Sequence, residues 1–215
     1  MEIRAAFFDL DETLYPLGNK VIYLLGERMN QFIEDKLAIP HNEVRSFRDS
    51  LYRTYGTTAK GLVVEYGIDL VDFLHYSHDI DTSQYILPAP ELRQMLDRIP
   101  VRKYIFTNAD RFHAIRILKH LTIYDCFDGI IDVLDVFPEC KPSPKAFEKA
   151  LRMTGVNSPS DCIFLDDYPQ NVDAAHDLGF YSIQVGGRSS AQRADAQIDR
   201  IEDLADLELF REFSL

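Results

Sequence analysis

Two aspartates, Asp9 and Asp11, directly follow a short apolar run, residues 5–8, near the start of the chain. A wholly apolar run of this kind is typical of a strand in the middle of a parallel sheet. Ligands bind in the crevice at the carboxyl ends of such strands. Because crowded carboxylates are unfavourable unless a cation or a reaction uses them, the pair indicates a functional site. The alternative is a solvated turn after a strand.

Three later polar segments follow predicted strands or precede predicted helices. In a doubly wound sheet the loops after different strands meet at one edge, so these segments are expected to lie beside Asp9 and Asp11. They combine carboxylates, a hydroxyl and a lysine. The segments are Thr107-Asn108-Ala109-Asp110, Lys141-Pro142-Ser143-Pro144 and Asp166-Asp167-Tyr168-Pro169-Gln170-Asn171.

This combination of side chains predicts phosphoryl transfer. Clustered carboxylates suit Mg2+, which prefers oxygen ligands, and a lysine and a hydroxyl suit phosphate oxygens. One carboxylate can act as a nucleophile and form an aspartyl-phosphate. A second can protonate the leaving oxygen and then accept a proton from water. The second role favours a raised pKa, which a crowded acidic site is expected to provide for Asp11.

The elements that must position these residues alternate between strand and helix from residue 90 onward. Repeated β-α units imply a parallel sheet with right-handed crossovers, and the strand at residues 5–9 is expected to join it. The later strands are predicted at residues 102–107, 129–133, 162–165 and 181–185. Short strand or helix segments are expected in the tail, residues 201–213.

Residues 16–88 show helical periodicity and no convincing strand. Four helices are expected, and glycine or proline residues separate them. The chain is therefore predicted to have an α/β core formed by residues 1–15 and 89–215, with a helical insert at residues 16–88.

Composition excludes several classes of function. The chain has 215 residues and a formal net charge of -12, so we expect no binding to nucleic acid and no adhesion to an anionic membrane. Its three cysteines form no C-x-x-C pair, which argues against a disulfide framework or a zinc site and favours the cytoplasm. The first strand leaves no room for a signal peptide, and no apolar stretch reaches the ~18 residues of a membrane span. The oligomeric state stays open.

The four polar segments, in this order, resemble the motifs of the haloacid dehalogenase-like (HAD) hydrolase superfamily. The resemblance implies a Rossmann-like three-layer core with an inserted helical cap that closes over the substrate. It implies that Asp9 is the nucleophile and Asp11 the general acid and base. Thr107 and the backbone amides near it would hold the phosphoryl group, and Lys141 would neutralise it.

The same resemblance implies a Mg2+ site. Asp9, the backbone carbonyl of Asp11, and Asp167 would bind the metal. Asp166 would be either a further ligand or a neighbour of a metal-bound water, and Asn171 would support this loop. Dehalogenases of the family lack an aspartate two residues after the nucleophile, whereas phosphatases have one. The sequence departs from many relatives at Tyr168, directly after Asp167, where they have a small serine.

Three stretches narrow the resemblance to the pyrimidine 5'-nucleotidase-like phosphatases. They are Leu14-Tyr15-Pro16, Tyr55-Gly56-Thr57-Thr58-Ala59-Lys60-Gly61-Leu62 and Phe106-Thr107-Asn108-Ala109-Asp110-Arg111. This likeness implies a nucleoside 5'-monophosphate substrate, UMP or CMP. The residues expected to contact it are Tyr55, Thr57, Thr58 and Lys60 from the insert, and Asn108 and Ala109 from the core.

Four alternatives remain at this point. A phosphatase for another small metabolite, such as a phosphosugar or phosphoglycolate, would use the same catalytic residues, and a phosphomutase would pass the phosphoryl group to an acceptor other than water. A non-catalytic binding module is less well matched, because both Asp9 and Asp11 are present. A 2-haloacid dehalogenase is less well matched because of Asp11, Lys141 and the carboxylates suited to a metal. His41, His75 and His78 are expected to lie on the surface.

Overall fold

The computed structural model describes residues 3–187 and 189–211, and its centre is a six-stranded sheet in the order β3-β2-β1-β4-β5-β6. Every pair of neighbouring strands is parallel. The strands are β1 (Ala5–Phe8), β2 (Arg102–Phe106), β3 (Gly129–Ile131), β4 (Cys162–Asp166), β5 (Tyr181–Val185) and β6 (Ala196–Ile198).

Strand β1 is central and buried along its whole length. Its side chains alternate between the two faces, as the pleat requires: Ala6 and Phe8 pack in one apolar cluster, and Ala5 and Phe7 in another. Phe8 is in register with Ile105 of β2 and Leu165 of β4. The loops that follow these three strands therefore begin at the same edge of the sheet.

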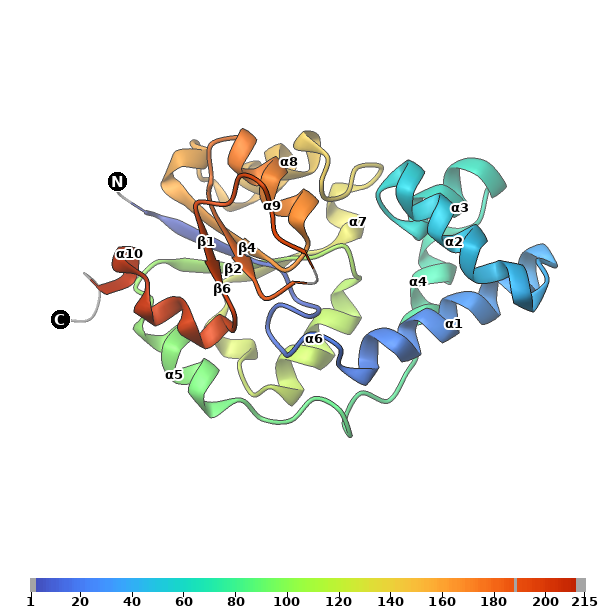
Figure 1. Ribbon diagram of the computed structural model, residues 1–215, viewed down its shortest axis with the longest axis horizontal. Coiled ribbons are helices and arrows are strands. Elements are labelled where there is room, and N and C mark those ends of the chain that lie inside the picture. Colours follow the sequence, from blue (N-terminus) through green and yellow to red (C-terminus); the bar gives the residue numbers. More distant parts are fainter. Residues whose placement is uncertain (1–2, 188, 212–215) are drawn as a thin grey trace.

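Helices cover both faces of the sheet, which gives three layers (Figure 1). One face carries α5 (Pro90–Arg98), α6 (Arg111–His120) and the C-terminal η3 (Ile201–Asp206) and α10 (Glu208–Arg211). The other carries α8 (Pro144–Thr154) and α9 (Pro169–Asp177). Shorter elements are η1 (Tyr124–Cys126), α7 (Val133–Val136) and η2 (Pro159–Asp161). The predicted Rossmann-like α/β fold is confirmed.

Four helices lie to one side of the sheet, and we refer to them as the helical unit (Figure 1). They are α1 (Lys20–Leu37), α2 (His41–Tyr55), α3 (Thr58–Tyr66) and α4 (Leu70–His78). Their apolar faces form a separate cluster, in which the rings of Phe32 and Phe73 are 5.2 Å apart. A side chain at Gly61 would lie 2.8 Å from Leu51, so α2 and α3 pack closely at this point. The division of the chain into two domains stays a prediction.

Several short elements were not expected from the sequence, among them α7 and β6. The strand predicted at residues 129–133 ends at Ile131, because the Asp132 side chain accepts a hydrogen bond from the backbone of Asp135 and caps α7. The edge strand β6 has only three residues and no fully buried one, too few for a periodic pattern to be recognised. In the tail, η3 and α10 are helical; residues 212–215 lie outside the described part of the chain.

The prediction that His78 lies on the surface is wrong. Only 6% of its surface is exposed, because it ends α4 against α6, where Asp110 binds its ring. No helix among the described residues is long and apolar enough to cross a membrane.

Candidate active site

The chain turns immediately after β1, and this turn carries three polar side chains of the site. The amide of Asp9 still donates to the Leu165 carbonyl at 2.8 Å, so Asp9 stays in line with the sheet. Glu12 then adopts a left-handed backbone conformation with a φ of 60°. The Thr13 hydroxyl lies 3.4 Å from an Asp9 carboxylate oxygen and accepts a hydrogen bond from the amide of Asp167 at 3.0 Å. Thr13 therefore joins the loops after β1 and β4.

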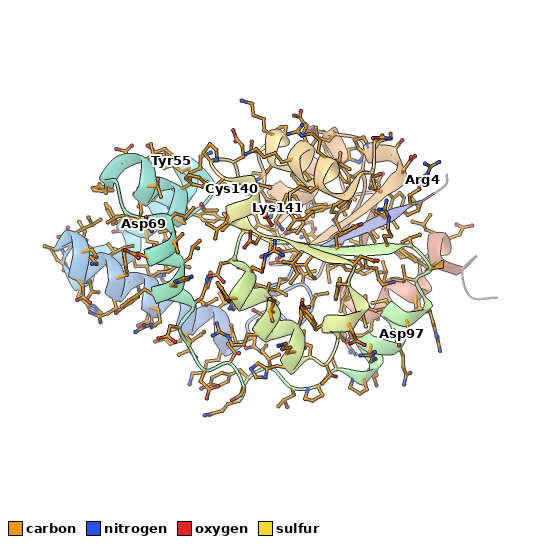
Figure 2. All side chains as sticks on the ribbon, turned by 180° about the vertical axis from the view of Figure 1, so that it is seen from behind. Arg4, Tyr55, Asp69, Asp97, Cys140 and Lys141 are labelled. Carbon is orange, nitrogen blue, oxygen red and sulfur yellow. The ribbon has the colours of Figure 1, made fainter. Side chains whose placement is uncertain are left out.

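Lys141 is the cation at the centre of the site. Its Nζ donates to Asp9 Oδ1 and to Asp166 Oδ2, each at 2.6 Å, and 1% of its side chain is exposed. Burial disfavours the charged amine, but the two carboxylates outweigh burial and raise the pKa of Lys141. Figure 2 shows Lys141 at the sheet edge that faces the helical unit, whereas Arg4 lies at the opposite end.

Asn108 fixes the backbone of Lys141. Its amide nitrogen donates to the Lys141 carbonyl at 3.0 Å, and its amide oxygen accepts from the Lys141 amide at 2.9 Å. Thr107, which directly follows β2, is buried, and its hydroxyl accepts from the amide of Ala109 at 3.0 Å. The loops after β2 and before α8 are thus held side by side.

Three carboxylates beside Lys141 form a group suited to a cation. Oxygens of Asp9, Asp166 and Asp167 all lie within 4.8 Å of one another. Burial and, after it, repulsion from neighbouring carboxylates raise the pKa of Asp167 to about 8. For Asp9, burial and the charge of Asp166 outweigh the opposite effect of the Lys141 charge, so the pKa of Asp9 is raised to about 7. Asn171 donates to both oxygens of Asp166 at 3.0 Å. An all-oxygen set with excess negative charge fits a hard divalent cation such as Mg2+.

The Asp11 carboxylate is not part of this group and has partners of its own. Its Oδ1 accepts from the Tyr15 hydroxyl at 2.6 Å and lies 2.8 Å from His113 Nε2. The expectation of a raised pKa for Asp11 is not met. Burial alone would raise it, but the charge and hydrogen bond of His113, together with the Tyr15 hydrogen bond, lower it.

A cavity of about 380 Å³ lies between the sheet edge and the helical unit. The core lines it with Asp9, Asp11, Thr107, Asn108, Ala109, Lys141, Asp166, Asp167, Tyr168 and Asn171. The helical unit lines it with Ile22, Leu25, Gly26, Met29, Arg48, Asp49, Tyr52, Thr57, Thr58, Ala59, Phe73, Leu74 and His78. The wall from α1 and α4 is mostly apolar, and the wall from α2 is polar.

The geometry brings together most of the residues predicted for the site. Thr57 and Thr58 line the cavity, but Tyr55 and Lys60 are not among its lining residues. The Tyr55 hydroxyl donates to Glu65, and Lys60 Nζ lies 3.9 Å from Glu139. The catalytic, metal and substrate roles given to these residues stay predictions.

Comparison with protein families decides the family of this chain. Residues 3–179 match the model for "haloacid dehalogenase-like hydrolase". The chain belongs to this family.

Its relatives include Phosphate metabolism protein 8 of Saccharomyces cerevisiae, which is 35% identical over 193 residues. That alignment covers 82% of this HAD hydrolase but only 59% of the yeast protein. The chain therefore spans about three fifths of the length of its curated relative.

Solved structures of other proteins share the fold. β-Phosphoglucomutase from Clostridium difficile superposes with a TM-score of 0.66 and 24% identity, over 98% of this chain and 96% of the mutase. A HAD phosphatase from Thermococcus onnurineus gives a TM-score of 0.64 and 21% identity, over 95% and 97% of the two chains.

Several residues of the site in this HAD hydrolase were missed from the sequence. Arg48 was not predicted; it lies one helical turn before Tyr52 on α2, and both residues line the cavity. A spacing of four residues places two side chains on the same face of a helix. The Tyr52 ring packs edge to face on Tyr168, with centroids 5.7 Å apart. The contacts of Thr13 with Asp167 and of His113 with Asp11 could not be predicted from a local pattern, because the partners are more than 100 positions apart in the sequence.

Proposed function

We propose that this chain is a Mg2+-dependent phosphomonoesterase that works through an aspartyl-phosphate on Asp9. The observation that carries the proposal is the contact of Lys141 Nζ with Asp9 and Asp166, with Asp167 completing a carboxylate group that spans no more than 4.8 Å. A nucleophile, a phosphate-neutralising cation and a cation-binding group then stand at one sheet edge. Phosphoryl transfer requires this positioning and charge neutralisation.

The reaction takes two steps. An Asp9 oxygen attacks phosphorus, the bond to the ester oxygen breaks, and Asp11 gives that oxygen a proton. Water then attacks the phosphorus of phospho-Asp9 and passes a proton to Asp11, and the Asp9–phosphorus bond breaks to release inorganic phosphate. The charge of a bound phosphate dianion favours a protonated Asp11, which offsets the lowering of its pKa in the free protein.

Mg2+ would be held by Asp9, Asp167 and the backbone carbonyl of Asp11, with Asp166 beside them. When bound, it would neutralise charge on the phosphoryl oxygens. Asp166 already accepts hydrogen bonds from Lys141, Asn171 and the amide of Tyr168, so its part is mainly to hold Lys141 and the loop in place.

We propose that residues 16–88 form a cap and that the substrate is a pyrimidine nucleoside 5'-monophosphate, UMP or CMP. The size of the cavity and its apolar wall suit a ribose and a base beyond the phosphate. Tyr52 offers a ring edge, and the guanidinium of Arg48 suits a base carbonyl. Among the described residues Arg48 donates to the Gly26 carbonyl at 2.6 Å, and a guanidinium has five N–H donors. The name of the yeast relative agrees with a phosphorylated substrate.

The test is phosphate release from a panel of phosphomonoesters, with Mg2+ and with EDTA, and with Asp9→Asn as the blank. Metal-dependent turnover concentrated on UMP and CMP supports the whole proposal. Turnover spread over phosphosugars or phosphoglycolate keeps the mechanism and rejects the pyrimidine assignment, and transfer to a sugar acceptor identifies a mutase. Turnover that survives Asp9→Asn, or EDTA-resistant activity on a haloacid, rejects the mechanism.

A further inference from the structure

Two donors converge on a single oxygen of Asp11. The Tyr15 hydroxyl and His113 Nε2 lie 2.6 Å and 2.8 Å from Asp11 Oδ1. The ring of His113 is fully buried, and Tyr15 is 4% exposed. Neither residue has a part in the two-step reaction above, and neither was expected at the site from the sequence.

The two ring nitrogens of His113 face different groups. Arg116 Nη2 lies 3.5 Å from His113 Nδ1, and a guanidinium nitrogen can donate but cannot accept. Arg116 therefore faces the Nδ1 side of the ring, and the opposite nitrogen, Nε2, faces Asp11. With its hydrogen on Nε2, His113 donates to Asp11 Oδ1 and holds that carboxylate in one orientation.

His78 from the helical unit and Asp110 from the core both hold the His113 side of the site in place. The His78 ring, at the end of α4, stacks on the His113 ring with centroids 4.7 Å apart and 21° between the planes. His78 Nδ1 lies 2.7 Å from Asp110 Oδ2, and Asp110 Oδ1 accepts from the His113 amide at 2.8 Å. Asp110 and His78 are 1% and 6% exposed, so water does not compete for these bonds. The orientation of His113 therefore depends on contacts from both parts of the molecule.

We propose that His113 is the positioning residue of Asp11, that it acts together with Tyr15, and that His78 and Asp110 brace it. With Oδ1 occupied by two donors, Oδ2 is the oxygen that carries the proton toward the leaving group. The inference rests on the proposed function, because it assigns an orientation to the general acid of that reaction.

The test compares two leaving groups. An alkyl ester such as UMP needs a proton on its departing oxygen, whereas p-nitrophenol departs as a stable anion and does not. Removing the donor by His113→Leu should lower kcat/KM for UMP by roughly 30-fold and for p-nitrophenyl phosphate by less than about 3-fold, since general acid catalysis contributes ~100-fold or more. His113→Gln, which keeps a donor at nearly the same place, should restore the UMP value to within about 5-fold. If UMP is not a substrate, the best alkyl ester of the panel takes its place.

His120→Leu, at the end of the same helix, is the matched control and should change neither value. Should His113→Leu fail to fold, Tyr15→Phe removes the other donor and should show the same selective loss on the alkyl ester. Equal losses on both esters, or no recovery with glutamine, would mean that His113 serves stability alone and would overturn the inference. Asp11→Asn distinguishes a failure of the positioning role of His113 from a failure of the general acid role of Asp11. A selective loss there without one in His113→Leu rejects the positioning role, and no selective loss in Asp11→Asn rejects the general acid itself.

Discussion

The two walls of the cavity are built in different ways. On the core side, polar groups hold one another: Lys141 binds two carboxylates, and Asp166 accepts from Lys141, Asn171 and a backbone amide. On the helical side, residues of α1 and α4 present apolar surface, and Arg48 is held by a backbone carbonyl. Fixed, charged groups suit a reaction common to many substrates, and an apolar wall with few polar groups suits the selection of one substrate.

The difference between the walls predicts that changes on the core wall lower catalysis and changes on the helical wall shift substrate preference.

Substitution of the nucleophile should have the largest effect. Asp9→Asn removes the charge that attacks phosphorus and should lower phosphate release by roughly 10⁴-fold or more. Phosphate assays and circular dichroism of the same sample check this; a folded variant that retains a tenth of the activity would contradict it.

Lys141→Met should lower both activity and stability. The substitution leaves Asp9 and Asp166 buried without their cation, and breaking a buried ion pair costs about 3–5 kcal/mol. Urea unfolding without Mg2+ measures the loss, and turnover should fall by roughly 10³-fold. The exposed Lys145→Met is the matched control, and equal stability of the two variants would show that Lys141 is not the partner that holds the group together.

Arg48→Met should act on the substrate rather than on the reaction. Loss of a charged hydrogen bond to the base should raise KM for UMP by about 10-fold and leave kcat, and the hydrolysis of ribose 5-phosphate, nearly unchanged. Arg45→Met, on the same helix but outside this cavity, serves as control. An equal loss with ribose 5-phosphate would place Arg48 with the catalytic groups and weaken the contrast between the walls.

The smallest expected effect is on stability as a function of pH. Asp9 and Asp167 have pKa values raised from 3.8 to about 7 and about 8, so between these limits these two carboxyl groups bind more protons in the folded chain than in the unfolded chain. The stability contributed by these two groups then falls as the pH rises from about 4 to about 8. In EDTA, Tm should be lower at pH 8 than at pH 5.5, and Mg2+ should reduce the difference. Asp167→Asn should flatten the dependence, whereas an unchanged slope would mean that Asp167 does not titrate in this range.

Much of the core side of the site was predictable, because its residues follow strand ends or precede helices. The sheet order places β2 and β4 on either side of β1, so the loops with Asp9, Thr107 and Asp166 had to meet. The same reasoning does not apply to Tyr55 and Lys60, which were expected to contact the substrate. Their side chains contact glutamates, and they are not among the residues that line the cavity. Helical periodicity predicts that a helix exists, but it does not say which of its polar faces lines the cavity.

The sequence by itself determined the parallel α/β sheet, the four helices between its first two strands, and the carboxylates, hydroxyl and lysine at the sheet edge. Local patterns carry these features, since burial, periodicity and turn residues act over a few positions. Only the tertiary structure decided that His78 is buried, that His113 binds Asp11 across 102 positions of the chain, and that Arg48 faces the cavity. These contacts depend on how α4 and α6 pack and on where the helical unit meets the core, and no local pattern encodes that geometry.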